Sequence, residues 1–360
     1  MKFYFAPLEG NTGFVYRTTH HEFFPEGMAQ YFTPFVVSNY TKKLKTREKV
    51  DVLPENNEGT PTIPQILSND VDEFLFTAKS IADMGYREVN INLGCPVRTV
   101  VVKHKGSGML QDLERLDRFL DGICEGAEQI LVDPDPVKEP GRTTPVPLRI
   151  SVKTRLGYDN VEEAPAIFSI YEKYPISELI VHARTRAELY SGQPELSVFR
   201  AICENTRLPL CYNGNINTVS DFRKITALLS EAENTPLEGA DPVSRLRTNL
   251  MIGRGLLTNP ALVREITTGQ KLGKDELRAF AAKLYERYLA QYTSFRGQSS
   301  GDTVVINRMK EFWVYAGRMF DDNGRFLKNI HKAKSRTEYE AAVRMIFANC
   351  ALREPEDGIA

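Results

Sequence analysis

The sequence lacks the features of membrane-spanning, secreted or disulfide-linked proteins. None of its apolar runs approaches the roughly 20 residues that a bilayer-spanning helix requires. The N-terminal residues 1–7 show no apolar core followed by a cleavage site, so we do not expect secretion. The five cysteines are odd in number and form no Cys-x-x-Cys pair. We therefore expect a protein of the reducing cytoplasm, without a membrane segment or a metal site.

Two further absences limit the architecture. The chain contains neither a repeat of 20 to 50 residues nor a Gly-x-Gly-x-x-Gly fingerprint. A solenoid and a dedicated dinucleotide-binding domain are therefore both unexpected. The 360 residues leave room for one large barrel and a smaller domain.

Short apolar segments alternate eight times with segments of helical pattern, which is the signature of a TIM barrel of the α/β class. The helical segments carry their own signals, such as the N-capping sequence Ser68-Asn69-Asp70 and the helix start after Asp112. The expected strands are 3–7, 29–36, 61–66, 88–93, 148–153, 178–182, 208–213 and 249–253.

Two insertions and a helical region complete the predicted organisation. The proline-rich insertion 126–147 is expected to be an irregular loop, and a second insertion covers 231–247. Amphipathic helices are expected at 274–295, 302–316, 324–334 and 336–352. We thus predict a barrel domain at 1–262, then a small all-α domain at 263–360, in a monomer without a stable protein partner.

Charge is distributed unevenly along the chain, although the net charge is only −1. Residues 261–353 hold 17 Lys and Arg against 10 Asp and Glu, whereas residues 1–260 hold 29 against 34. The basic C-terminal excess suggests a polyanionic partner, but a solvated helical surface would look the same. The aromatic residues at 312, 313, 315 and 320 fit helix packing better than base stacking.

The fourth expected strand ends abruptly at a cysteine, in the sequence Asn90-Ile91-Asn92-Leu93-Gly94-Cys95-Pro96. In a parallel barrel, the carboxyl ends of the strands form the active-site face. Cys95 alone could equally be a small buried hydrophobe. The other strand ends are also polar, however, and include Gln65, Lys153 and His182.

These polar residues suit a phosphorylated planar ligand. Glycine turns follow strands 7 and 8, where barrels bind phosphate, and Arg254 could bind the anion. Gln65 and Asn92 could pair with a heterocycle that carries imide groups. Lys153 must meet an anion or be a reactive amine, and beside a flavin it would stabilise negative charge. His182 alone could be a core histidine that binds a carbonyl.

Seven ordered motifs resemble the tRNA-dihydrouridine synthase family over nearly the whole length. They are Ala6-Pro7-Leu8-Glu9-Gly10, Gln65, Asn90-x-Asn92-x-Gly94-Cys95-Pro96 with Gly106-Ser107-Gly108, Val152-Lys153-x-Arg155, His182-x-Arg184-Thr185, Asn213-Gly214-Asn215-Ile216 and Met251-Ile252-Gly253-Arg254-Gly255.

The resemblance implies an FMN enzyme that uses NADPH to reduce uridines in tRNA to 5,6-dihydrouridine, with Cys95 as the proton donor. By this resemblance the cofactor-binding residues are Pro7, Leu8, Gln65, Lys153, His182, Asn213, Gly214, Asn215, Gly253 and Arg254. The substrate residues would be Asn92 and Arg184 in the barrel, and Arg308, Lys310, Arg325, Lys328 and Lys332 on the helices.

Three alternatives stay open at this point. A related FMN barrel could reduce a free pyrimidine, as dihydroorotate dehydrogenases do. A phosphate-binding lyase could use Lys153 as a Schiff-base nucleophile, which would leave Cys95 and Gln65 unexplained. A barrel without catalysis could serve only as an RNA-binding protein.

Overall fold

The computed structural model of the protein describes residues 1–136, 140–232, 247–296, 298–322 and 324–353. Its first half contains β1 (Phe3–Phe5), α1 (Phe14–Phe23), β2 (Met28–Phe32), β3 (Val36–Val37), α2 (Thr46–Val52), η1 (Pro54–Asn56), β4 (Thr62–Ile63), β5 (Gln65–Leu67), α3 (Val71–Ala82), β6 (Glu88–Asn92), α4 (Arg98–Val101), η2 (Gly106–Gln111), α5 (Leu113–Glu128), β7 (Leu131–Val132), β8 (Val146–Pro147), β9 (Arg149–Arg155), η3 (Val161–Glu163) and α6 (Ala164–Tyr171).

The second half contains β10 (Leu179–His182), α7 (Leu196–Asn205), β11 (Leu210–Asn213), α8 (Val219–Ala232), β12 (Asn249–Ile252), α10 (Arg254–Thr258), α11 (Leu262–Thr268), α12 (Lys274–Arg296), α13 (Gln298–Ala316), η4 (Gly317–Met319), α14 (Arg325–Lys332) and α15 (Arg336–Asn349). Among the described residues, no helix combines the length and hydrophobicity needed to cross a bilayer.

The main sheet has the order β3-β5-β6-β9-β10-β11-β12-β1-β2-β4. The pairs β2–β4, β3–β5, β5–β6, β6–β9, β9–β10, β10–β11 and β11–β12 are parallel. β2 and β3 are two halves of one expected strand, and only Pro64 separates β4 from β5. Since β2 pairs with β4 and β3 pairs with β5, these halves close the ring. The predicted TIM barrel is confirmed.

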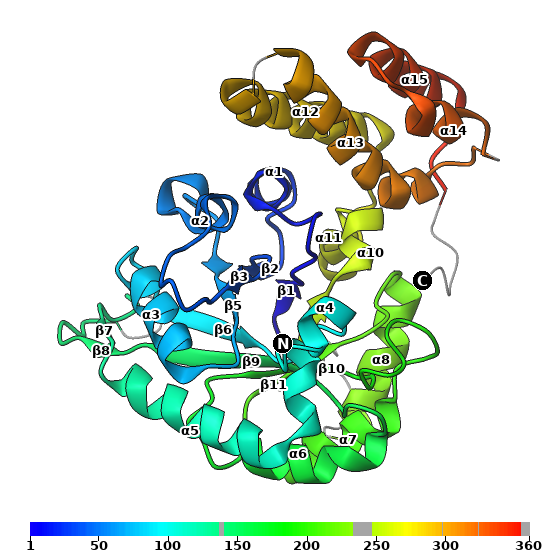
Figure 1. The fold of residues 1–360 in the computed structure, drawn as a ribbon. Helices are drawn as coiled ribbons and strands as arrows, with labels where there is room; N and C mark the ends of the chain where they lie inside the picture. Colours follow the sequence, from blue (N-terminus) through cyan, green and yellow to red (C-terminus); the bar gives the residue numbers. More distant parts are fainter. Residues whose placement is uncertain (137–139, 233–246, 297, 323, 354–360) are drawn as a thin grey trace. The chain divides into compact units, whose positions relative to one another are not determined.

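The barrel interior is a packed core and not a channel. The buried residues Tyr4, Phe32, Ile180 and Met251 from four strands form one hydrophobic cluster, together with Ala6 and Cys211. Helices α3, α5, α6 and α7 lie along the outer side of the strands (Figure 1). The predicted caps at Asp70 and Asp112 are present, because each carboxylate accepts a hydrogen bond from a backbone N–H three residues later.

The chain separates into two compact units, each described here by itself. The first contains Met1–Pro7, Ala29–Asn215 and Lys224–Met251, and the second contains Leu8–Met28, Ile216–Arg223 and Ile252–Ala360. The second unit therefore includes α1, α10 and α11 as well as the C-terminal helices. The domain boundary after residue 262 stays a prediction.

Within the second unit, α12 packs along α13, and α14 packs against α15 (Figure 1). Helix α1 packs on α12 through Tyr16 and Phe23, whose rings meet the ring of Phe280 edge-on. Trp313 is almost fully buried and donates a hydrogen bond from Nε1 to the Tyr339 hydroxyl, at 3.1 Å. Phe312 and Phe320 are also buried, whereas Tyr315 is half-buried, so the prediction of a packing core is confirmed for three of the four aromatic residues.

Three predicted segments differ from the structure. The expected strand 29–36 is interrupted after Phe32, and the expected strand 61–66 is interrupted at Pro64, which has no N–H to donate to a ladder. The prediction that 126–147 is irregular throughout is wrong, because α5 continues to Glu128 and β7 pairs with β8 in antiparallel register. Most of the 231–247 insertion lies outside the described residues.

Candidate active site

Cys95 lies in a turn that the preceding strand shapes. β6 ends at Asn92, whose Oδ1 accepts hydrogen bonds from the backbone N–H groups of Gly94, at 3.0 Å, and Cys95, at 2.9 Å. The Cys95 carbonyl in turn accepts from the Ser107 N–H, at 3.1 Å, and the Ser107 hydroxyl, at 2.9 Å. The thiol is half-buried, and the backbone on both sides of it is fixed.

Two glycines in η2, Gly106 and Gly108, allow this segment to pack closely against the turn that carries Cys95. Gly106 has a φ of 58°, and a Cβ at this position would lie 2.7 Å from the Cys95 carbonyl oxygen. A Cβ on Gly108 would lie 2.6 Å from the Val101 carbonyl oxygen. The motif Gly106-Ser107-Gly108 therefore holds the cysteine turn in place, because no larger residue fits at either glycine.

Amide side chains connect the cysteine turn with the barrel interior. Asn92 donates from Nδ2 to Gln65 Oε1, and Gln65 donates from Nε2 to Asn90 Oδ1, each at 2.8 Å. Asn90 then donates to the Ser151 hydroxyl at 3.0 Å. Gln65 and Asn90 are fully buried. This row orients the Asn92 side chain, which sequence reasoning assigned to the substrate but which here shapes the turn.

Lys153 lies near the end of β9 and is held by Asn213 from β11. Its ammonium donates to Asn213 Oδ1 at 2.9 Å, and Asn213 donates from Nδ2 to the Met251 carbonyl at 2.8 Å. Burial, together with the nearby Arg155 guanidinium, lowers the pKa of Lys153 to about 8. The sequence predicted Lys153 and Asn213 at the ends of strands 5 and 7, and the structure brings their side chains into contact across the end of β10.

Arg155 is a residue that the site prediction left out. It is fully buried and donates from Nε to the Gly94 carbonyl at 2.8 Å. Its Nη1 donates to the carbonyls of Thr185, at 2.7 Å, and Leu189, at 2.9 Å. Burial lowers the pKa of Arg155 to about 10. Arg155 thus joins the cysteine turn to the loop after β10.

His182 ends β10 beside Arg184, whose Nη1 lies 3.1 Å from His182 Nε2. A guanidinium can only donate, so Nε2 accepts and a neutral ring carries its proton on Nδ1. Arg184 also donates to the carbonyls of Ser191 and Gly192, at 3.0 Å and 2.6 Å. This buried arginine, which was assigned to the substrate, therefore orients His182 and the following loop.

Tyr190 is a second residue that sequence reasoning missed. Its exposed ring lies 6.1 Å from the His182 ring, and the Arg155 guanidinium lies 5.5 Å from its centroid. Tyr190 belongs to an irregular loop, so no periodic pattern could have indicated its position. Its pairing with two strand-end residues makes it part of the candidate site.

The remaining predicted cofactor residues lie in turns after strands. Gly214 and Asn215 follow β11 in the first unit, and both are half-buried. In the second unit, Gly253 precedes α10, which begins at Arg254. Pro7 is half-buried after β1, and the Leu8 N–H donates to the Thr12 hydroxyl at 2.8 Å.

Residues 4–351 match the family model described as "Dihydrouridine synthase (Dus)". The chain belongs to the dihydrouridine synthase family. Curated relatives include a "Probable tRNA-dihydrouridine synthase" of Rickettsia typhi, which is 26% identical over 73% of this chain and 70% of that protein. A "tRNA-dihydrouridine synthase B" of Proteus vulgaris is 24% identical over 96% of this chain and 94% of its own length. The protein of that name from Pseudomonas aeruginosa is 27% identical over 82% of this chain and 79% of its own length.

Membership of this family makes the chain an oxidoreductase with a TIM barrel. The lyase alternative and the alternative without catalysis do not fit this assignment. Reduction of a free pyrimidine would use the same type of reaction as reduction of uridine in tRNA. A comparison of tRNA with a free pyrimidine as the substrate distinguishes the two.

The predicted basic residues of the helical region differ in their exposure. Arg325, Lys328 and Lys332 are exposed on α14 at helical spacing. Lys310 on α13 is half-buried, and its charge contributes, after burial, to lowering the pKa of His331 on α14. Lys310 of α13 and His331 of α14 therefore lie near each other.

Arg308 differs from the other basic residues of the helices. Its guanidinium donates to the Gly10 carbonyl in the loop after β1, and it pairs with Glu311 at 2.9 Å. Only 21% of the side chain is exposed. Arg308 thus joins α13 to the loop Leu8–Thr12, a contact inside the second unit.

Proposed function

We propose that this protein reduces uridine in tRNA to 5,6-dihydrouridine, with FMN as cofactor, NADPH as electron donor and Cys95 as proton donor. The observation that carries the proposal is the fixed position of Cys95 at the active-site face of a barrel whose family is defined by dihydrouridine synthesis. The curated relatives named as tRNA-dihydrouridine synthases support tRNA as the substrate.

The residues present fit a flavin. Lys153 offers a cationic donor, and the hydrogen-bonded amides of Gln65 and Asn92 form a polar floor at adjoining strand ends. Gln65, Lys153 and His182 would hold the ring system, together with Pro7 and Leu8. In the first unit, Asn213, Asn215 and the backbone N–H of Gly214 would bind the phosphate. In the second unit, Gly253 and Arg254 are assigned to the phosphate by the family resemblance. A bound FMN, reduced by NADPH, would supply the hydride for C6 of the uracil.

Cys95 supplies the proton that C5 of the uracil requires. A thiol with an ordinary pKa near 8.5 stays protonated at neutral pH, as a general acid must. Arg155 positions this thiol through the Gly94 carbonyl, and Ser107 positions it through the Cys95 carbonyl. The uridine must leave its base stack to reach the thiol.

The helices would hold tRNA through its phosphates. Arg325, Lys328 and Lys332 present three cations on the exposed side of α14, and Lys310 adds a fourth from α13. Contacts to phosphates position an RNA without reading its sequence. Which uridine enters the barrel then depends on how these helices orient the tRNA.

The test is an anaerobic reaction of the full-length protein. The flavin is reduced with NADPH, unmodified tRNA is added, and flavin reoxidation and dihydrouridine are measured together. We expect tRNA-dependent reoxidation and one dihydrouridine for each flavin reoxidised. Reoxidation by a free pyrimidine but not by tRNA would favour the small-molecule alternative, and absence of flavin would refute the cofactor assignment.

Replacement of Cys95 tests its role separately. We expect Cys95→Ala to retain its flavin and to lose at least about a hundredfold in the rate of dihydrouridine formation. Cys203→Ala is the matched control, because Cys203 is also only partly buried but lies on α7. Equal rates for Cys95→Ala and Cys203→Ala would remove Cys95 from the mechanism.

A further inference from the structure

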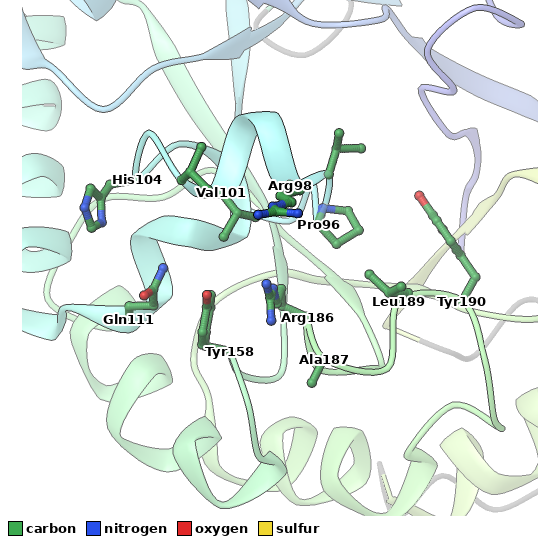
Figure 2. Close-up of a pocket in the computed structure, with 12 residues that line it drawn as sticks. Pro96, Arg98, Val101, His104, Gln111, Tyr158, Arg186, Ala187, Leu189 and Tyr190 are labelled. Carbon is green, nitrogen blue, oxygen red and sulfur yellow. The ribbon is translucent and has the colours of Figure 1, made fainter.

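A cavity of about 660 Å³ lies beside the cysteine turn (Figure 2). Pro96, the residue after Cys95, forms part of its wall, whereas Cys95 itself does not. The other walls come from α4 and from the loops after β9 and β10, so the cavity lies on the active-site face of the barrel. Its volume is that of a typical ligand pocket. We call it the Tyr158 cavity.

The charge of the Tyr158 cavity is one-sided. Arg98 lines it from α4 and Arg186 from the loop after β10, together with His104. None of the twelve described lining residues is Asp or Glu. Two guanidinium groups that share a cavity repel each other, and an anion such as a phosphate removes this cost while accepting their hydrogen bonds.

Planar and aliphatic groups also line the Tyr158 cavity. The Arg186 guanidinium lies over the Tyr158 ring, 4.6 Å from its centroid. The buried Nε of Arg186 has no hydrogen-bond partner among the described residues. Val101 and Leu189 add aliphatic surface, and Figure 2 shows Tyr158 and Arg186 projecting toward the helix that carries Arg98. Aromatic and guanidinium planes of this kind bind unstacked bases.

We propose that the Tyr158 cavity binds the nucleotide of tRNA that neighbours the uridine to be reduced. Its base would stack on Tyr158 and Leu189, and its phosphate would bind Arg98 and Arg186. This inference rests on the proposed function. It follows because a uridine that leaves its stack to reach Cys95 exposes the base beside it, and the Tyr158 cavity begins at the residue after Cys95.

The first test measures the Kd of tRNA for the flavin-containing protein at fixed salt. We expect Arg98→Gln to raise this Kd about tenfold, the effect of one charge-assisted hydrogen bond. We expect Tyr158→Leu to raise it at least about fivefold, the effect of one lost stacking contact. Arg118→Gln is the matched control, because it removes the same charge from an exposed position on α5.

The second test places an abasic site on either side of the target uridine. With the wild type, one of the two abasic tRNAs should bind about fivefold more weakly. The Tyr158→Leu variant should bind that RNA and the unmodified tRNA equally, because its stacking surface is already lost. Independent, additive effects of the two changes would overturn the proposal.

The remaining outcomes separate this inference from the proposed function. Wild-type protein that binds tRNA without forming dihydrouridine refutes the function, while the Kd comparison still decides the role of the cavity. Unchanged tRNA Kd values for Arg98→Gln and Tyr158→Leu refute the cavity proposal. A raised KM for NADPH in flavin reduction without tRNA, with an unchanged tRNA Kd, would assign the cavity to the dinucleotide instead.

Discussion

At the scale of single residues, the polar side chains at the strand ends are bound chiefly to one another. Asn213 holds Lys153, Arg184 holds His182, and Asn92 holds the cysteine turn. Residue type and strand position were enough to predict that these groups converge. Their division into groups that face a ligand and groups that orient others depends on distances, which the sequence does not contain.

The titration of Lys153 should control flavin affinity. Its pKa of about 8 means that the ammonium loses its proton as the pH rises from 7 to 9. An anionic ligand favours the charged form, so we expect FMN affinity to fall above pH 8, by at most about tenfold per pH unit for one linked proton. The measurement is a fluorescence titration of flavin-free full-length protein with FMN.

Two variants identify the group responsible for this pH dependence. Lys153→Arg keeps its charge throughout this pH range and should show a flat profile. Lys153→Met should bind FMN more weakly and also without pH dependence. A decline above pH 8 that persists in Lys153→Met would assign it to another group.

At the scale of elements, the sequence was a good guide wherever the signal was local. Helices α3 and α5 begin after their predicted caps, and α12 to α15 lie within a few residues of the expected positions. Contacts between distant segments could not be predicted. The antiparallel pair β7 and β8 joins residues on either side of a proline-rich stretch, and Arg308 meets a carbonyl 298 positions earlier in the chain.

The close contact between η2 and the cysteine turn should make Gly106 intolerant of any side chain. We expect Gly106→Ala to lose about 2 to 4 kcal/mol of unfolding free energy, about 1 to 2 of it from the left-handed backbone. The displaced Cys95 carbonyl should also lower the rate of uridine reduction. Thermal unfolding and the single-turnover rate measure the two effects.

Gly59→Ala separates backbone strain from this contact. Gly59 has a φ of 71°, but a Cβ there would meet no atom within 4 Å. This variant should lose only the backbone part of the unfolding free energy and should reduce uridine at the wild-type rate. If Gly106→Ala matched it in both measurements, the contact with Cys95 would have no functional role.

At the scale of the whole molecule, attraction of a polyanion cannot come from net charge, which is −1. It must come from the uneven distribution of charge, and α14 presents three exposed cations and no acidic residue. A phosphate contact releases counterions, so each one makes the affinity for RNA more sensitive to salt. This sensitivity distinguishes a true phosphate contact from a solvated charge.

We expect the triple variant Arg325→Gln, Lys328→Gln and Lys332→Gln to bind tRNA more weakly and to reduce the slope of log Kd against log salt by about 2 to 3. Flavin content should be unchanged.

The matched control replaces Lys79, Arg118 and Lys173, which are exposed on or beside barrel helices, and removes the same total charge. Because both triple variants have the same net charge, a difference between their slopes measures where tRNA binds. Equal slopes would mean that α14 is only a solvated face. Arg308→Gln should lower thermal stability, since its guanidinium donates to the Gly10 carbonyl, and an unchanged slope in this variant would mean that Arg308 makes no phosphate contact.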